Sequence, residues 1–195
     1  MKIYALTGGI GAGKSAASKR FAERGIPVID SDALGHEVIE PDAPAFQAVV
    51  QRFGDGILKD GRIDRPALGE IVFSDPKALQ DLNAIVHPAV IAETGRLSAE
   101  YAAQGHAAII IEAALHAEDG TLREPFEALI LVDCPEEIRI QRLVENRQMA
   151  PEEARSRIKN QTPPEKKKPL ARWIIQNDKS MVDLTRQVDA IVPEL

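Results

Sequence analysis

The segment at residues 8–15, which reads GGIGAGKS, constrains the fold of this chain more than any other feature. It satisfies the pattern G-x-x-x-x-G-K-[ST], in which glycines let the backbone curl until successive N–H groups point at phosphate oxygens. A short apolar run at residues 2–7 precedes it, and a helical pattern at residues 14–24 follows. Strand, loop and helix therefore come in the order that a phosphate-binding loop requires.

The residues of this loop predict a nucleotide site that includes a metal ion. The Lys14 side chain can reach the β- and γ-phosphates, and the Ser15 hydroxyl is placed to bind Mg²⁺. The motif alone does not distinguish a kinase from a GTPase or an ATP-driven motor. The residues that we expect to bind ATP in this segment are Gly9, Ile10, Gly11, Ala12, Gly13, Lys14, Ser15 and Ala16.

Strands and helices alternate along the rest of the chain, which predicts a parallel sheet with helices on both faces. The apolar runs AAIIIE and ALILVD are typical of central strands that are covered on both sides. We expect strands at residues 2–7, 27–30, 107–112, 128–133 and 173–175, and later helices at residues 135–145, 151–160 and 181–192. The predicted fold class is α/β, the three-layer α/β/α fold of P-loop NTPases with a parallel five-stranded sheet.

The stretch from residue 34 to residue 104 has a mostly helical pattern and predicts an insertion between the second and third strands. We expect breaks in it at Pro41, Pro44, residues 54–61, Pro76 and Pro88. His87 precedes Pro88, which favours a packed histidine outside a helix.

Composition argues against several classes of protein. The formal net charge of -6 disfavours general binders of nucleic acid or of anionic membranes. The N-terminus carries no signal segment, and no apolar run reaches the ~20 residues of a membrane span, so we expect a cytoplasmic protein. The single cysteine, Cys134, is expected to be a core thiol, and the four histidines show no metal-ligand spacing. We expect a monomer or a weak homo-oligomer.

Carboxylates at predicted strand ends are candidates for chemistry. Asp30 or Asp32 could orient an acceptor hydroxyl and take its proton, although Asp30 and Ser31 could equally cap a helix that begins near Ala33. Glu112 and Asp133 end the two apolar strands, where a carboxylate can hold magnesium-bound water, and Glu112 is the preferred one.

Arginines and lysines near the break before Pro151 give a second group of candidates. Arg142 or Arg147 could close over the phosphates from a lid and neutralise charge that develops during transfer. For any one arginine, including Arg139, Arg155 and Arg157, a solvated position is the simpler interpretation. The lysine run at residues 166–168 is likewise typical of a solvated face.

Several segments together resemble the dephospho-CoA kinase family over essentially the whole chain. LTGGIGAGKS and VIDSD are similar to the family's loop and its Asp-x-Asp signature. LNAIVHPAV is similar to its Leu-His-Pro segment, and RSRIKNQ and WIIQND to its Arg-Ile-x-x-Gln and Ile-x-Asn stretches.

The resemblance implies a reaction and a set of residue roles. It implies ATP-dependent phosphorylation, with Mg²⁺, of the ribose 3′-hydroxyl of dephospho-CoA in an adenylate-kinase-like fold. Asp32 would orient and deprotonate the hydroxyl, His87 and Glu112 would lie on the acceptor side, and Asn177 would lie near the adenine of ATP. The implied parts of this single domain are a core at residues 1–32, 105–140 and 170–195, an acceptor-binding helical region at residues 33–104, and a lid at residues 141–169.

The chain departs from the family pattern at three places. EAALHAE at residues 112–118 replaces Asp-x-Pro-Leu-Leu-Phe-Glu, and Ala171-Arg172 replaces an Ala-Asp pair. Asn146-Arg147 stands where the family has Arg-Asp, so the catalytic arginine is either Arg147 or Arg142. Two rival functions remain open from the sequence: another small-molecule or nucleotide kinase of the same fold, and a nucleotide-binding regulatory module.

Overall fold

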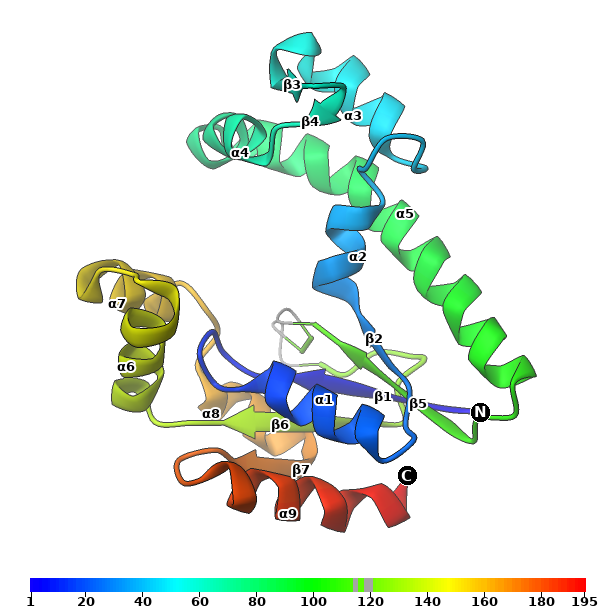
Figure 1. The fold of residues 1–195 in the computed structure, drawn as a ribbon, viewed down its shortest axis with the longest axis vertical. Helices are drawn as coiled ribbons and strands as arrows, with labels where there is room; N and C mark the ends of the chain where they lie inside the picture. The colour runs from blue at the N-terminus through cyan, green and yellow to red at the C-terminus, as the bar shows by residue number, and fades with distance from the viewer. Residues whose placement is uncertain (114–115, 118–120) are drawn as a thin grey trace. The chain divides into compact units, whose positions relative to one another are not determined.

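A computed structural model describes residues 1–113, 116–117 and 121–195 of the chain. The chain divides into two compact units, shown in Figure 1. The first contains residues 1–30 and 101–195, and the second contains residues 31–100.

The first unit is built on a five-stranded parallel sheet with the order β2-β5-β1-β6-β7. Ala5 at the centre of the sheet lies opposite Ile111 on one side and Leu129 on the other. The predicted α/β/α fold and its five parallel strands are thereby confirmed. The strands are β1 (Lys2–Thr7), β2 (Val28–Asp30), β5 (Ala108–Glu112), β6 (Ala128–Asp133) and β7 (Ala171–Gln176).

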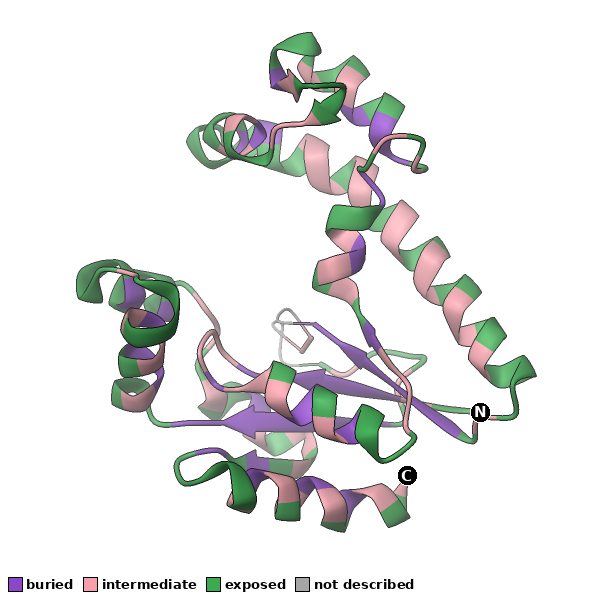
Figure 2. Cartoon of the chain, viewed as in Figure 1, coloured by how far each residue is buried: buried purple, intermediate pink, exposed green. Residues whose placement is uncertain are grey.

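Helices α1 (Lys14–Glu23) and α9 (Met181–Ile191) pack together on one face of this sheet. Phe21 of α1 and Leu184 of α9 are fully buried in the same cluster as Tyr4 of β1. Every residue of β5 and β6 is buried, because both faces of these central strands are covered (Figure 2). This burial explains the unbroken apolar runs of the two strands.

Helices α6 (Glu136–Arg147) and α7 (Pro151–Lys159) form a pair with a small core of its own. Leu143 and Ala154 are its most buried members, and Ile10 of the glycine-rich loop packs against it. The predicted break between these helices is shorter than expected, because α6 continues to Arg147, and the following Gln148 takes a left-handed conformation. The short helix α8 (Pro164–Lys167) follows before β7.

The second unit is mainly helical and has a separate hydrophobic core. Val49, Ile57 and Leu68 are central members of that core. The helices are α2 (Ser31–Glu37), α3 (Phe46–Phe53), α4 (Arg65–Ser74) and α5 (Pro76–Ala103), whose last residues belong to the first unit. A two-stranded antiparallel hairpin, β3 (Leu58–Lys59) and β4 (Arg62–Ile63), was not predicted.

The predicted break at Pro88 is wrong, because α5 runs through this residue. Proline removes one helical N–H donor, in this case the partner of the Ala84 carbonyl. Val86 before it and Ala89 after it both pack against the core of the second unit, which holds the two halves of the helix in line. His87 is therefore helical and exposed, rather than packed outside a helix.

Within the described residues, no helix combines the length and the apolar character that crossing a membrane demands.

Candidate phosphate-binding site

The glycine-rich loop joins β1 to α1 at the carboxyl end of the sheet's central strand. The Ala12 N–H donates to the Gly9 carbonyl at 3.0 Å and closes the turn. Gly13 takes a φ of 100° immediately before α1, a left-handed conformation that favours glycine. Helix α1 therefore begins at the loop, and its N-terminus places the positive end of the helix dipole there, as an anion site requires.

Lys14 and Ser15 begin α1 as the motif predicts. The Lys14 ammonium donates to the Gly8 carbonyl at 3.0 Å, so the side chain folds back along the loop. Ser15 is exposed at the start of the helix. The Lys14 ammonium therefore lies at the start of the loop, beside Gly8, and the Ser15 hydroxyl lies at its end.

Asn177 lies directly after β7 and supports the loop from the C-terminal part of the chain. Its side-chain nitrogen donates to the Ala12 carbonyl at 2.7 Å, and its backbone N–H donates to the Asp133 carbonyl at 2.8 Å. A Cβ on Gly13 would stand 2.1 Å from this nitrogen, so only glycine allows the approach. The side chain that the resemblance places near adenine is thus packed on the loop.

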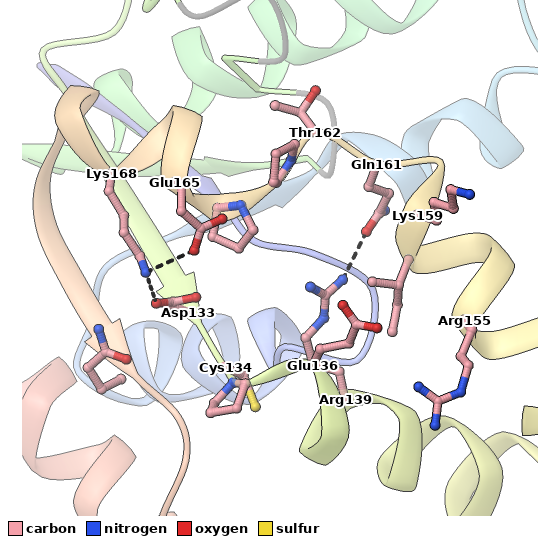
Figure 3. A pocket seen from close by; sticks show the side chains of 15 residues that line it. Asp133, Cys134, Glu136, Arg139, Arg155, Lys159, Gln161, Thr162, Glu165 and Lys168 are labelled. Carbon is pink, nitrogen blue, oxygen red and sulfur yellow. Dashed lines mark hydrogen bonds and ion pairs between the residues drawn. The ribbon is translucent and has the colours of Figure 1, made fainter.

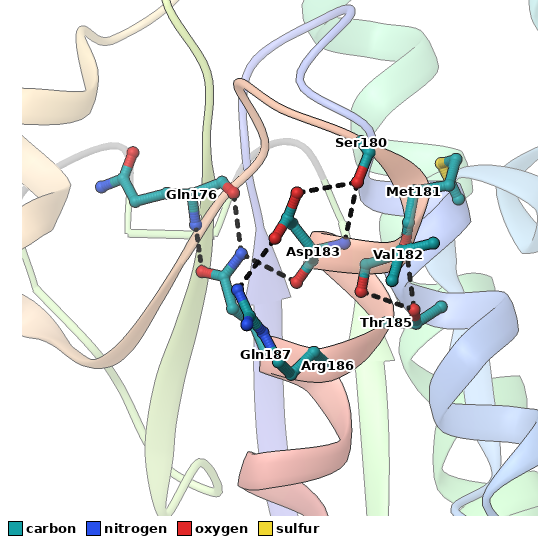
Figure 4. A network of polar contacts seen from close by, with 8 residues as sticks. All are labelled: Gln176, Ser180, Met181, Val182, Asp183, Thr185, Arg186 and Gln187. Carbon is teal, nitrogen blue, oxygen red and sulfur yellow. Dashed lines mark hydrogen bonds and ion pairs between the residues drawn. The ribbon is translucent and has the colours of Figure 1, made fainter.

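A polar network fixes the start of α9 just beyond Asn177 (Figure 4). The Ser180 hydroxyl accepts from the Asp183 N–H at 3.2 Å and donates to the Asp183 carboxylate at 2.7 Å. Gln187 accepts from the Gln176 N–H and donates to the Gln176 carbonyl. These contacts cap the helix and hold the end of β7, which keeps the Asn177 turn in place.

Arg142 of α6 reaches the same turn and is half-buried. One nitrogen donates to the Asn177 carbonyl at 3.0 Å, and the other lies 3.4 Å from the Cys134 sulfur. Arg147 is exposed at the last residue of α6. The two candidate arginines therefore differ in their contacts. Arg142 is hydrogen-bonded to the turn beside the loop, whereas Arg147 is exposed at the end of α6.

Arg139, for which a solvated position was the simpler interpretation, is instead 4% exposed. Its Nε donates to the Ile10 carbonyl at 2.9 Å, and Gln161 accepts from both Arg139 and the Ile10 N–H. The sequence pattern did not distinguish this residue from the other arginines. The sequence did contain one signal for a role near the loop, because Arg139 lies three residues before Arg142 and therefore on the same face of the helix.

Glu112 ends β5 and is 5% exposed. Its carboxylate accepts a short hydrogen bond from the hydroxyl of Ser18 on α1. Ser18 lies one turn after Ser15 on the same helix face. Glu112, the carboxylate preferred for holding magnesium-bound water, therefore packs against α1, the helix that carries the Ser15 hydroxyl.

Asp133 ends β6 beside a cavity of about 570 Å³ that Figure 3 shows. Its carboxylate pairs with Lys168 at 2.8 Å, and this hydrogen bond raises the pKa of Lys168. Lys167 is 4% exposed. The prediction of a solvated lysine run is thus wrong for Lys167 and holds for Lys166, which is exposed, while Lys168 is ion-paired and still 36% exposed.

Cys134 follows Asp133 and is 3% exposed, as expected for a core thiol. Burial raises the pKa of this thiol above its ordinary value. A thiol that resists ionisation is a poor nucleophile, so Cys134 packs rather than reacts.

Asp32 and His87 belong to the second unit and are both exposed. Asp32 lies in the first turn of α2, which begins at Ser31 rather than near Ala33. Asp30 remains the last residue of β2 in the first unit. Of the altered segment at residues 112–118, positions 114, 115 and 118 lie outside the described residues.

No group of three or more His, Cys, Asp or Glu side chains that could hold a metal ion occurs in the part of the chain that the structure describes. Mg²⁺ does not need such a cage, since it commonly keeps several waters and binds through substrate phosphates. The exposed Ser15 hydroxyl, a hard oxygen ligand beside the phosphate loop, fits this mode of binding.

Comparisons of sequence give a consistent family. A sequence model of dephospho-CoA kinase matches residues 2–183. A dephospho-CoA kinase from Streptomyces avermitilis is 42% identical over 191 residues, which cover 97% of this chain and 92% of that protein.

Comparisons of structure identify proteins with the same fold. A protein of Thermus thermophilus with a solved crystal structure shares 32% identity and a TM-score of 0.80, over 100% of this chain and 97% of the other. A shikimate kinase from Acinetobacter baumannii, solved with shikimate, shares 14% identity and a TM-score of 0.54, over 100% of this chain and 94% of the other. The second likeness shows the fold alone.

Proposed function

The chain belongs to the dephospho-CoA kinase family, and we propose that Lys14, Ser15 and Asp32 are central to its reaction. The enzyme phosphorylates the ribose 3′-hydroxyl of dephospho-CoA with ATP and forms coenzyme A in the final step of its synthesis. The comparisons do not favour another small-molecule or nucleotide kinase. The observation that carries the residue proposal is the loop from Gly8 to Ser15, formed between β1 and α1.

The loop binds the phosphates of ATP in this proposal. Residues Gly9 to Ala16 supply N–H groups and the positive end of the α1 dipole. The Lys14 ammonium moves from the Gly8 carbonyl to the β- and γ-phosphates, which are stronger acceptors. Arg142 and Asn177 border the loop at Ala12 and define the side on which the base of ATP is bound.

Mg²⁺ would be held by the Ser15 hydroxyl together with phosphate oxygens and water. When bound, it neutralises charge on the β- and γ-phosphates. The Glu112 carboxylate, hydrogen-bonded to Ser18 one turn after Ser15, is available to hold one of the waters. These roles require no cluster of carboxylates.

Asp32 acts on the acceptor. A carboxylate in the first turn of α2, exposed and two residues beyond β2, can accept the proton of the 3′-hydroxyl as that oxygen attacks the γ-phosphorus. The positioned hydroxyl and the leaving diphosphate must lie in line. Arg147, exposed at the end of α6, is the lid arginine that stabilises the charge of the transition state.

The second unit supplies the binding surface for the acceptor. It contains a cavity of about 590 Å³ lined mainly by apolar side chains, including Val72, Phe73 and Val86. Arg65 and His36 stand at the same cavity, with Arg65 Nη2 and His36 Nε2 2.6 Å apart. We assign the apolar part to the pantetheine arm and Arg65 to the diphosphate of dephospho-CoA, while exposed His87 lies on the acceptor side.

The proposal also covers the setting of the reaction. A single buried cysteine, which cannot form an internal disulfide, fits a reducing compartment, and we place the enzyme in the cytoplasm. We propose a monomer or a weak homo-oligomer, which sedimentation over a range of concentrations would test.

An acceptor panel tests the assignment. ADP release with Mg-ATP would be measured with dephospho-CoA, AMP, CMP and shikimate as separate acceptors. We expect turnover with dephospho-CoA well above the other three. Equal or faster turnover with any of the others would reject the assignment of the acceptor site, and mass spectrometry of the product would locate the new phosphate.

A further inference from the structure

Arg139 and Gln161 hold both polar backbone groups of Ile10, which lies within the glycine-rich loop. The Arg139 Nε donates to the Ile10 carbonyl at 2.9 Å, and the Ile10 N–H donates to the Gln161 Oε1 at 2.7 Å. The Arg139 Nη2 also donates to the same Gln161 oxygen, at 3.3 Å (Figure 3). The three residues form a closed ring of hydrogen bonds that joins α6 and the end of α7 to the loop.

The Arg139 guanidinium is buried and forms no ion pair with a described carboxylate, although Glu136, Asp133 and Glu165 attract it from a longer distance. Its side chain is 4% exposed, and its two hydrogen-bond acceptors are a backbone carbonyl and a neutral amide. Burial lowers the pKa of this guanidinium from its ordinary value. Burying an unpaired charge is unfavourable, so this arrangement would be stabilised by an anion that binds nearby.

The loop packs against Arg139 without any intervening space. A Cβ on Gly9 would stand 2.2 Å from Arg139 Nη2, and a Cβ on Gly11 would stand 2.9 Å from the Arg139 backbone carbonyl. The guanidinium therefore lies against the turn whose N–H groups face the phosphates. At such short range and out of bulk water, a positive charge acts strongly on bound phosphate.

We propose that Arg139 is a positioning residue whose charge, not held in an ion pair, also favours the phosphates of the nucleotide, and that Gln161 preserves that charge because its amide is neutral. This role rests on the proposed phosphate site. Arg139 fixes the orientation of the Ile10 peptide from behind the loop, and its charge attracts the phosphates without direct contact. Gln161 transmits the position of α7 to the loop through the Ile10 N–H.

Gln161→Glu distinguishes this role from that of a purely structural brace. The introduced carboxylate can accept the same two hydrogen bonds and adds an ion pair with Arg139. If Arg139 only braces the loop, the variant should be at least as stable as wild type and should bind nucleotide equally well. If the charge matters, the variant keeps its thermal stability but loses about tenfold or more in affinity for Mg-ADP, because the positive charge is cancelled.

Adenosine, which lacks phosphates, is the matched ligand. Calorimetry would compare Mg-ADP and adenosine on wild type, Gln161→Glu, Arg139→Lys, Arg139→Gln and the surface control Arg186→Gln, whose residue is 78% exposed on α9. For Gln161→Glu, we expect the affinity for adenosine to stay within about twofold of wild type. For the Arg139 variants, we expect the affinity for Mg-ADP to be highest in wild type, lower in Arg139→Lys and lowest in Arg139→Gln. Arg186→Gln should behave as wild type.

The outcomes distinguish the role of the Arg139 charge from the proposed phosphate site itself. Wild-type Mg-ADP affinity in a folded Gln161→Glu variant would overturn the role of the Arg139 charge and leave the phosphate site standing. An equal loss of ADP and adenosine affinity would also overturn it, since that pattern reports a distorted site. Failure of the wild type to bind Mg-ADP would reject the phosphate site and this inference together.

Discussion

Asn177 donates a hydrogen bond from its side-chain nitrogen to the backbone carbonyl of Ala12 at 2.7 Å, across a separation of 165 residues. Both residues are buried, and the Asn177 carbonyl in turn accepts from Arg142 at 3.0 Å. The conformation of the phosphate loop near the N-terminus therefore depends on a turn near the C-terminus. Because the Asn177 side chain also occupies the space beside Gly13, the conformation of the loop and that of the turn depend on each other.

Asn177→Ala is predicted to weaken both folding and nucleotide binding. It removes the 2.7 Å donor of the buried Ala12 carbonyl and leaves only a 3.5 Å contact with Arg142, which should lower the free energy of unfolding by about 1–3 kcal/mol. Affinity for Mg-ADP should fall as well, because the loop loses a support next to Gly13. Urea unfolding and calorimetry would measure the two effects. Asn160→Ala, at an exposed asparagine, is the control, and unchanged affinity in the Asn177 variant would contradict the prediction.

Asp32→Asn is predicted to lower kcat about 10²- to 10⁴-fold, the range for loss of a general base. Affinity for Mg-ADP should stay near wild type, since Asp32 acts on the acceptor. Asp30→Asn is the matched control, because Asp30 ends β2 two residues earlier and is also exposed. Initial rates with dephospho-CoA would decide between them. A large loss in the Asp30 variant with little change in the Asp32 variant would move the role to Asp30.

Arg142 and Arg147 are predicted to affect different kinetic constants. Arg142 is anchored at Asn177, so Arg142→Gln should raise the KM for ATP and lower the melting temperature. Arg147 is exposed at the end of α6, so Arg147→Gln should lower kcat with little change in stability or in nucleotide affinity. Steady-state kinetics and thermal unfolding of both variants would be compared. A lowered kcat with unchanged KM in the Arg142 variant alone would exchange the two roles.

The sequence predicted the sheet because its strands carry simple signals. β6 was predicted at its observed bounds, Ala128–Asp133, since all its residues are buried and apolar up to the final carboxylate. The loop from Gly8 to Ser15 was equally predictable, because its motif is a run of consecutive residues in which Gly11 and Gly13 take the positive φ angles that glycine favours. Both features are encoded by contiguous stretches of sequence.

Features that depend on distant packing were not predicted. Arg139 is buried against the glycine-rich loop, which lies 129 residues earlier at Ile10 and accepts its hydrogen bond. Helix α5 continues through Pro88 because residues on both sides of it pack against the core of the second unit. The hairpin of β3 and β4 is too short for a periodic pattern to develop.

The Arg20–Asp189 pair predicts a pH dependence of stability. It joins α1 to α9 through two hydrogen bonds of 2.8 and 2.6 Å, which hold the pKa of Asp189 below its usual value. A carboxyl whose pKa falls on folding stabilises the fold above the unfolded pKa of about 3.9 and loses this contribution as pH decreases further. Asp189→Asn should therefore lower the melting temperature at neutral pH, with a difference from wild type that shrinks below about pH 4.

Thermal unfolding from acid to neutral pH would measure this difference. Glu145→Gln, at an exposed carboxylate of α6, is the control and should show little effect at any pH. A difference for Asp189→Asn that stays constant across the acid range would show that the charge of Asp189 does not contribute.

Phe73→Ala is predicted to impair use of the acceptor without affecting ATP. Phe73 lines the apolar cavity of the second unit yet is 85% exposed, so its removal should hardly change stability. If the pantetheine arm covers this ring, its loss should raise the KM for dephospho-CoA about 5- to 50-fold, corresponding to burial of part of an aromatic side chain. Initial rates at saturating ATP would measure the change.

The acceptor itself supplies the sharpest control for this prediction. AMP carries the ribose hydroxyls but no pantetheine arm, so any slow turnover with AMP should be equal in wild type and Phe73→Ala. Ile91→Ala removes another exposed apolar side chain, 71% exposed on α5, that does not line the cavity, and its KM for dephospho-CoA should match that of wild type. If Phe73→Ala changes turnover with AMP as strongly as with dephospho-CoA, the ring does not bind the arm. If only dephospho-CoA is affected, the cavity is the pantetheine site, because the cost then appears only when the arm is present.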